Sequence, residues 1–396
     1  LTTILIGGRA GLAAGMWTSL GIALYWDRSL SVFITGMVAT TVASHSTRRV
    51  RTRTKVVKLS LVVGLAQIIC LLGVTLLDWD SPDVMCVVHR ATASLVGGLL
   101  SAVIALLILP LFESVFAITT DITLLEFSDL GHPLLQRLAL EAPGTYHHSL
   151  VVANLAQAAA EAIEANSLEA RVCSYFHDIG KLTKPNFFAE NIHMQQNPHD
   201  DLPPSMSTLV ITAHVKEGLS LAMLNKLPEP VLRAIREHHG SSMLMYFHQK
   251  AKSQLEFEME STDSGSGNPK VDEGAFRYQG PRPSTRESAI ICLADAVEAA
   301  SRSLEKTTPG HIEGLVSDIV RMRLDDGQLD ACELTMKELN SVRRAFVFTL
   351  TTMLHGRVPY PRDESKDKQQ SKTPPRERPE HRGANGVADE SSSHAG

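Results

Sequence analysis

The segment from Leu59 to Leu77 (LSLVVGLAQIICLLGVTLL) contains no charged side chain, and this feature most limits how the chain can fold. An ordinary soluble helix shows a polar face, whereas about 20 apolar residues are enough to cross a bilayer as a helix. Three further apolar stretches, of which the second is short, occupy residues 4–26, 29–45 and 91–118. We therefore expect about four transmembrane helices within residues 1–118. Buried helices of a soluble bundle are the alternative.

A cluster of basic residues separates the second and third apolar stretches. It consists of Arg48, Arg49, Arg51, Arg53, Lys55 and Lys58. Such a cluster can bind nucleic acid, but its position between apolar segments favours a cytoplasmic loop under the positive-inside rule. We therefore expect the lipid bilayer, and no nucleic-acid polymer, as a partner. Residues 46–58 are then cytoplasmic, Asp78–Asp83 form an external turn, and the chain from about Thr119 is cytoplasmic.

Residues 120–361 show a helical pattern, with apolar residues three or four positions apart and no convincing run of alternating β-branched residues. This pattern predicts an all-α fold, in which the transmembrane helices precede a nearly all-helical soluble domain at 119–361. A polar segment at about 252–274 is predicted to be a flexible loop. Residues 362–396 lack the apolar content for a core and are predicted to be disordered. The five scattered cysteines argue against a disulfide framework or a zinc ribbon.

Histidine and aspartate residues follow one another in a suggestive order along this domain. They are His148 in TYHHSL, His177 and Asp178 in YFHDIGK, His214 in ITAHVKEG, His238 and His239 in REHHG, and Asp295 in LADAVEA. Imidazole and carboxylate suit divalent Mn, Fe, Zn, Co or Ni. In an adjacent His-Asp pair the imidazole can bind one ion while the carboxylate bridges to a second, and two such ions activate water and clamp phosphate oxygens. A lone helical histidine is more often a core or surface residue, so it is the ordered set that favours a metal centre.

The segments around these residues resemble a known family. The region from about Pro110 to Pro361 resembles the cytoplasmic domain of the seven-transmembrane HD-domain proteins, the PgpH-like cyclic di-AMP phosphodiesterases of the HD phosphohydrolase superfamily. HDIGK alone indicates the superfamily, whereas APGTYHHS, NPHD and YQGPRPSTRE point to the membrane-bound branch. Other matching segments are LPLFES, LLEFSDLGHPLLQRL, IREHHG, LADAVEAASRSL and HGRVPYP. The resemblance implies that the four spans are the last of seven in a bacterial inner membrane, preceded by an extracytoplasmic sensor domain.

The resemblance also implies a site for two divalent ions, Mn or Fe. One ion is expected at His148, His177, Asp178 and Asp295, and Asp178 is expected to bridge to a second ion at His214, His238 and His239. Both histidines of the last pair are expected in or beside the site, without a decision on which one is the ligand. His147 fits the superfamily motif less well than His148.

Three further residues of this region invite a functional interpretation. Lys181 follows the HD dyad by three residues, so on a helix it can face the same side as Asp178 and meet a phosphate oxygen as a second catalytic group. A solvated lysine at a helix end is an equally good interpretation. His193 and His199 are interpreted as loop residues near the substrate entrance.

The resemblance implies a metal-dependent phosphodiesterase that hydrolyses a cyclic dinucleotide, cyclic di-AMP, to linear pApA in second-messenger signalling. Two alternatives stay open: an HD phosphohydrolase that acts on an alarmone or a phosphomonoester, and a membrane receptor that transmits a signal without turnover. The complete set of ligand positions argues against the receptor. A homodimer is compatible with a helical HD domain, although the sequence shows no interface.

Overall fold

The computed structural model describes residues 1–26, 28–47, 50–77, 84–192, 197–261, 271–304 and 308–355. Throughout these ranges the regular elements are helices, and the β-type pairing found among them is an isolated bridge between Met243 and Arg277. The predicted all-α fold is therefore confirmed.

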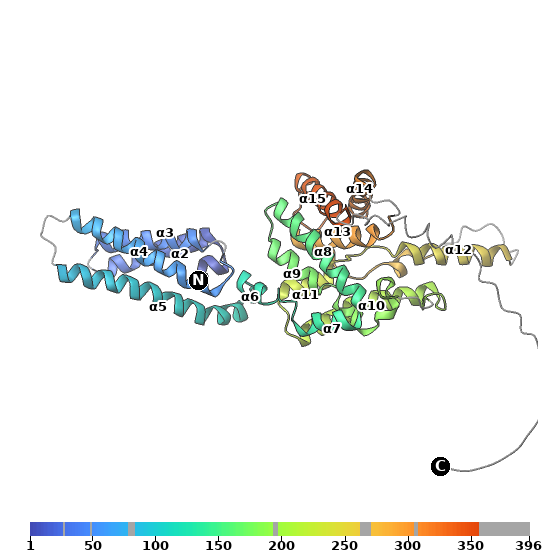
Figure 1. Ribbon diagram of the computed structural model, residues 1–396, viewed down its shortest axis with the longest axis horizontal. Helices are drawn as coiled ribbons and strands as arrows, with labels where there is room; N and C mark the ends of the chain where they lie inside the picture. The colour runs from blue at the N-terminus through green and yellow to red at the C-terminus, as the bar shows by residue number, and fades with distance from the viewer. Residues whose placement is uncertain are drawn as a thin grey trace, which may run out of the picture. The chain divides into compact units, whose positions relative to one another are not determined.

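The amino-terminal part of the described chain consists of apolar helices (Figure 1). They are α1 (Thr2–Leu5), α2 (Gly8–Tyr25), α3 (Leu30–Ser46), α4 (Arg53–Leu77) and α5 (Val84–Phe116). The first apolar stretch is divided at Gly7, whose φ of 120° is easy for glycine and strained for other residues. Because α4 starts at Arg53, part of the predicted basic loop is the first turns of a helix.

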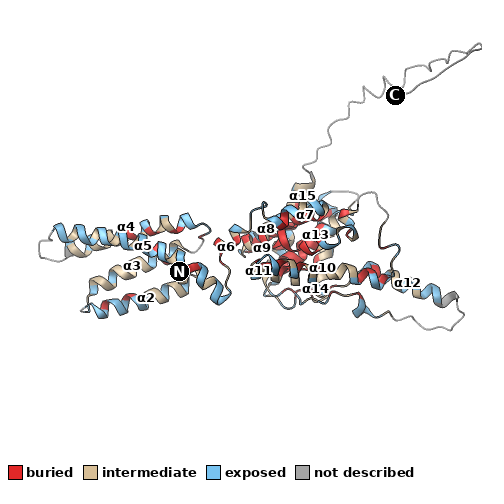
Figure 2. Cartoon of the chain, turned by 90° about the horizontal axis from the view of Figure 1, so that it is seen from below, coloured by how far each residue is buried: buried red, intermediate tan, exposed pale blue. Residues whose placement is uncertain are grey.

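Two of these helices are candidate membrane spans. By length and composition α4 and α5 are long and apolar enough to cross a membrane, and α3 is a shorter apolar helix. Only 11% of the most apolar window of each long helix is buried within the protein, in contrast to the carboxy-terminal helices (Figure 2). An apolar surface of this extent needs lipid or protein as its neighbour. The predicted turn at Asp78–Asp83, together with Arg48 and Arg49, lies outside the described residues.

The helices that follow lie in the region 119–361, which the sequence predicts to be a soluble domain. Its α-helices are α6 (Asp121–Glu126), α7 (Pro133–Glu141), α8 (Pro143–Ala162), α9 (Ser167–Phe176), α10 (Pro204–Leu224), α11 (Glu229–Glu237), α12 (Met245–Ser261), α13 (Arg286–Ser301), α14 (Pro309–Asp325) and α15 (Met336–His355). Short 3-10 turns are η1 (Ile179–Thr183), η2 (Pro185–Phe187), η3 (Ala189–Asn191) and η4 (Glu273–Phe276).

Helix α13 lies at the centre of this domain. Every residue from Ser288 to Glu298 is buried, and α13 packs against α8, α9, α11 and α14 (Figure 2). A helix that is apolar on most sides is stable only inside a core, where close packing fixes its rotation and register. This helix carries Asp295, so the carboxylate is placed by the core itself.

Local signals set where the helices of the site begin. The side chain of Asn166 accepts the backbone N–H of Glu169 at the start of α9, and Thr285 accepts that of Ser288 at the start of α13. Such caps satisfy backbone donors that have no partner within the helix. Helix α8 begins with Pro143, whose fixed φ suits the first helical position.

Two glycines allow the HD dyad to approach α10. A Cβ atom added at Gly180 in η1 would lie 1.8 Å from the backbone oxygen of His214 and 2.5 Å from the backbone nitrogen of Gly218. The backbones of η1 and α10 therefore touch directly at this crossing. His177 and Asp178 come shortly before Gly180 in the chain, so this contact brings them next to the helix that carries His214.

The predicted flexible loop at 252–274 is corrected in part. Helix α12 continues to Ser261, so residues 252–261 are helical. The i,i+4 ion pair between Lys252 and Glu256, at 3.9 Å, is of the kind that supports an exposed helix. Residues 262–270 and the tail at 362–396 lie outside the described residues.

The glycine crossing generates a prediction about stability. Replacement of Gly180 by Ala should destabilise the domain by about 3 kcal/mol, because the new methyl group meets backbone atoms that cannot rotate away. The matched control is Gly314→Ala in α14, where nothing lies within 4 Å and alanine should stabilise the helix by up to about 1 kcal/mol. Thermal unfolding of the two purified variants, followed by circular dichroism, makes the comparison. Equal midpoints would contradict the proposed close contact.

Candidate metal centre

His148 lies in the second turn of α8 and is buried. Its Nε2 atom lies 3.0 Å from Oδ1 of Asp295 and 3.4 Å from Oδ2 of Asp178. Residues separated by nearly 150 positions in the sequence therefore meet at one point, because α8 and α13 pack against each other.

The HD dyad marks the end of α9. His177 is the residue that follows the helix, and Asp178 leads into the 3-10 turn η1. Both side chains are fully buried. Nε2 of His177 lies 3.3 Å from Oδ2 of Asp178 and 3.9 Å from Oδ1 of Asp295. The change from an α-helix to a 3-10 turn thus directs both members of the pair toward the same centre.

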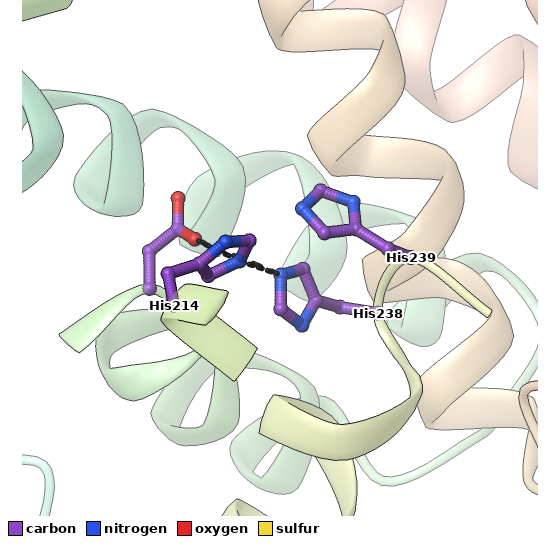
Figure 3. A group of neighbouring side chains, drawn as sticks. His214, His238 and His239 are labelled. Atoms are coloured by element: carbon purple, nitrogen blue, oxygen red, sulfur yellow. Dashed lines mark hydrogen bonds and ion pairs between the residues drawn. The ribbon is translucent and has the colours of Figure 1, made fainter. Parts of the chain in front are cut away.

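His214 and the pair His238–His239 come from two other elements (Figure 3). His214 belongs to α10, and the pair follows the end of α11. Nε2 of His214 lies 3.4 Å from Oδ1 of Asp178, and Nε2 of His238 lies 3.6 Å from the same oxygen. Nδ1 of His239 lies 3.3 Å from Oδ2 of Asp295. The structure therefore brings together all seven predicted ligand residues.

The Nδ1 atoms of three of these rings face backbone oxygens. His177 contacts the oxygen of Ser174 at 2.8 Å, His214 that of Ile211 at 2.6 Å, and His238 that of Ile235 at 2.9 Å. A carbonyl oxygen only accepts, so each Nδ1 carries a proton, which leaves Nε2 as the ring atom that can bind a cation. The Nε2 atoms of His214 and His238 are 3.3 Å apart, so a shared proton or a shared cation can join these two rings.

Asp178 lies between two groups of ligand atoms. One group consists of His148, His177, Asp178 and Asp295, and the other of Asp178, His214, His238 and His239. Within each group the potential ligand atoms lie within 4.8 Å of one another. Oδ2 of Asp178 faces the first group and Oδ1 faces the second. This is the arrangement expected of a carboxylate that bridges two ions.

Several buried polar atoms at this point have no hydrogen-bond partner. They are Nε2 of His148, Nε2 of His177 and Oδ1 of Asp178. Buried polar atoms without partners are rare and costly, and here they converge on one place. The atoms are nitrogen and oxygen donors, which are ordinary ligands of divalent transition metals. The residues therefore fit bound cations.

The electrostatics of the site point in the same direction. Burial acts against a charge on His177, but the neighbouring charge of Asp178 raises its pKa to about 9. Burial also opposes a charge on His148, yet the nearby carboxylates of Asp178 and Asp295 hold its pKa well above the usual value. On the other side burial lowers the pKa of His214 to about 4. The half of the site that contains both carboxylates thus attracts positive charge, and metal ions supply such charge without protons.

Lys181 is placed beside Asp178, as its spacing predicts. Its Nζ atom lies 2.8 Å from Oδ2 of Asp178 and 2.7 Å from Oε1 of Glu190. Burial opposes the charge of Lys181, but the two carboxylates raise its pKa above the usual value. Burial likewise opposes the charge of Glu190, but the positive charge of Lys181 lowers the pKa of Glu190 to about 2. Lys181 is therefore a charged, paired residue at the site rather than a solvated lysine.

Glu298, which was not predicted from the sequence, lies behind His148 and supports its ring. Glu298 is buried and forms a hydrogen bond to Nδ1 of His148, and Arg302 holds Glu298 with hydrogen bonds of 2.9 Å and 2.8 Å. A carboxylate in this position fixes the tautomer and orientation of a ligand imidazole. The signal was present, because Glu298 follows Asp295 by three residues in LADAVEA and so shares its helix face.

The remaining histidines lie apart from the ligand groups. His147 is exposed, in line with the preference for His148. His199 is buried in an aromatic contact between Phe187 and Phe247, and its Nε2 atom lies 2.9 Å from the backbone oxygen of Phe187. His199 is outside both ligand groups and is not among the residues that line the cavity at the site. His193 lies outside the described residues.

A cavity of about 840 Å³ opens onto the ligand groups, and His148, His214, His239 and Asp295 line it. Its volume falls within the range of ~300–1,000 Å³ that is common for small-molecule sites. Tyr278, which was not predicted from the sequence as a site residue, lines the cavity and stacks on His239 with ring centroids 4.2 Å apart. Burial raises the pKa of the Tyr278 hydroxyl, so this side chain is neutral.

Comparison with known proteins links this site to a family. Residues 1–120 match the model of the 7TM receptor with intracellular HD hydrolase, and residues 145–300 match the model of the HD domain. The cyclic-di-AMP phosphodiesterase PgpH of Bacillus subtilis is 37% identical over 316 residues, which cover 80% of this chain and 43% of that protein. PgpH of Listeria monocytogenes is 40% identical over 68% of this chain and 36% of its own length. The chain thus spans less than half the length of these curated relatives.

A solved structure resembles the soluble domain. The crystal structure of the L. monocytogenes PgpH HD domain matches with a TM-score of 0.52 and 40% identity, over 57% of this chain and all of that chain. A second crystal structure, of the same domain in complex with cyclic-di-AMP, matches with a TM-score of 0.50 and 40% identity, over 58% of this chain and 99% of that chain. This chain therefore belongs to the PgpH-like family of HD-domain proteins with a membrane-linked seven-transmembrane region.

Proposed function

We propose that this protein is a phosphodiesterase that hydrolyses cyclic di-AMP to linear pApA. The observation that carries the proposal is the position of Asp178, with one carboxylate oxygen toward each of two ligand groups. Two bridged cations suit in-line displacement at a phosphate. The substrate is suggested by the relatives, which are named cyclic-di-AMP phosphodiesterases, and by the related HD domain solved with cyclic-di-AMP.

The proposed metal site consists of the two groups of ligand residues described above. One divalent ion would be held by His148, His177, Asp178 and Asp295, and a second by Asp178, His214, His238 and His239. Mn and Fe are the proposed ions, since imidazole and carboxylate suit both. When bound, the ions would activate water and stabilise negative charge on the phosphate.

The side chains around the ligands have separate tasks in this proposal. Asp178 holds the two cation positions at a fixed separation, while Glu298 keeps the Nε2 atom of His148 directed inward. Lys181 lines the cavity and can offer its ammonium group to a phosphate oxygen while Glu190 keeps it in place. Apart from the metals, catalysis then rests on orientation and charge.

We also propose that the membrane region is multi-pass and that the HD domain lies in the cytoplasm of a bacterium. The support is the basic sequence before and at the start of α4, in which Arg51, Arg53, Lys55 and Lys58 precede a long apolar helix. Such residues are retained on the cytoplasmic side of a membrane.

The first prediction about function tests the substrate and the bridging role of Asp178 together. The metal-loaded protein should hydrolyse cyclic di-AMP faster than cyclic di-GMP or ppGpp. The Asp178→Ala variant should lose at least ~100-fold of this rate, because both cation positions lose a ligand at once. Asp318→Ala, a change of an exposed aspartate in α14, is the control and should leave the rate unchanged.

Product formation is measured by chromatography, and folding by circular dichroism. A folded Asp178→Ala protein with nearly the parental rate would remove the basis of the two-metal assignment. A parent protein that prefers ppGpp would favour the alarmone alternative, and metal binding without turnover would favour the receptor.

A second prediction concerns Glu298. The Glu298→Gln variant should bind Mn about 10- to 100-fold more weakly, because His148 loses the charged partner that orients it. Glu313→Gln, which removes an exposed carboxylate in α14, is the matched control. Isothermal titration with Mn compares the two affinities. Equal affinities would show that His148 needs no support from Glu298.

A third prediction concerns topology. Reporters fused after Thr52 and after residue 361 should both lie on the cytoplasmic side, because an even number of spans separates the two fusion points. Green fluorescent protein reports the cytoplasm and alkaline phosphatase the outer side. Opposite locations of the two fusions would contradict the proposed orientation.

A further inference from the structure

Three long cationic side chains line the cavity at the ligand groups: Lys181, Arg302 and Arg323. The first two are bound to carboxylates, as described above. Among the described lysines and arginines of this cavity, Arg323 is the one without an ion pair, and its Nε atom is buried with no hydrogen-bond partner. The side chain as a whole is only partly buried, so a ligand in the cavity can supply the partner that Nε lacks.

Arg323 forms no ion pair with Asp326, the neighbouring carboxylate whose pKa its charge helps to lower. The carboxylate of Asp326, three residues further along the chain, is held by Arg277 at 3.0 Å and by Gln328 at 2.8 Å. The remaining face of α14 that reaches the cavity is apolar, with Ile319 and Met322. The fold therefore leaves Arg323 available to something that enters the cavity.

The cavity wall suits a nucleotide ligand of considerable size. Helix α13 contributes the small residues Ala296, Ala299 and Ala300, which leave space beside Asp295. Met243 and Met245 add flexible, polarizable surface against which flat rings can pack. A ligand that reaches the cations can thus extend along α13 and α14.

A cyclic dinucleotide contains two phosphodiester groups in one ring, and the cations can engage only the one that is cleaved. We propose that Arg323 binds the second phosphate and so selects substrates that carry two phosphates. A planar guanidinium group can form two parallel hydrogen bonds to phosphate oxygens, which gives both affinity and orientation. This inference rests on the proposed function, and it makes Arg323 a binding residue rather than a metal ligand.

The test uses the full chain in detergent and two substrates. Cyclic di-AMP carries two phosphates, whereas bis(4-nitrophenyl) phosphate is a phosphodiester with one. The Arg323→Gln variant should raise KM for cyclic di-AMP by about 10-fold or more, the typical effect of losing a charged hydrogen bond. Its kcat/KM for bis(4-nitrophenyl) phosphate should stay within about twofold of the parent, because the metal centre is untouched.

Two further variants make the result specific. Arg321→Gln removes an exposed arginine from the same helix and should change neither substrate. Arg323→Lys keeps the charge but loses the planar fork, so its KM should lie between those of the parent and Arg323→Gln. Metal content and circular dichroism should be the same for all four proteins.

The outcomes separate this inference from the proposed function. If the parent turns over cyclic di-AMP and Arg323→Gln has the same KM, the second-phosphate role is wrong while the function stands. An equal loss with both substrates, or a loss of metal, would also overturn it, because Arg323 would then act through the fold or the metal centre. If the parent does not turn over cyclic di-AMP at all, the proposed function fails first and the inference falls with it.

Discussion

The buried carboxylate of Asp178 is the group on which the rest of the soluble domain depends. Its oxygens lie 3.3–3.6 Å from the Nε2 atoms of four histidines, and Oδ1 has no hydrogen-bond partner. Removing a charge from water costs several kcal/mol, which is recovered only when opposite charge is close and well oriented. Lys181 supplies part of that charge. The helices that converge here thus keep an unfavourable cluster in place, and cations make it favourable.

The surrounding architecture explains how such a cluster can persist. Asp295 and Glu298 lie in the most buried stretch of the domain, where close packing allows little movement. The direct backbone contact between η1 and α10 fixes the approach of Asp178 to His214. The packing of the core therefore positions the ligand residues. A change in the packing of α13, or in the contact at Gly180, would also change the distances between the ligand atoms.

The sequence predicted the helical class, the apolar helices and the residues that meet at the centre. The spacing of apolar residues indicates the helices, and the order of the histidine and aspartate motifs along the chain indicates the site. The role of Glu298 was missed, since it depends on the packing of α13 against α8, which places a carboxylate behind His148. The surroundings of His199 could not be predicted, because they come from long-range contacts with Phe187 and Phe247. The polar composition of residues 252–261 suggested a loop, whereas the structure forms helix α12 there.

The hydrogen bonds from Nδ1 to backbone oxygens have a thermodynamic consequence. His177, His214 and His238 are each tied to an oxygen three residues earlier in the chain, so their rings are oriented by their own helices. The rotational entropy of these side chains is therefore lost when the chain folds and not when an ion arrives. The histidines form a preorganised cage, in which ion capture is accompanied mainly by the release of water and protons rather than by an ordering of the protein.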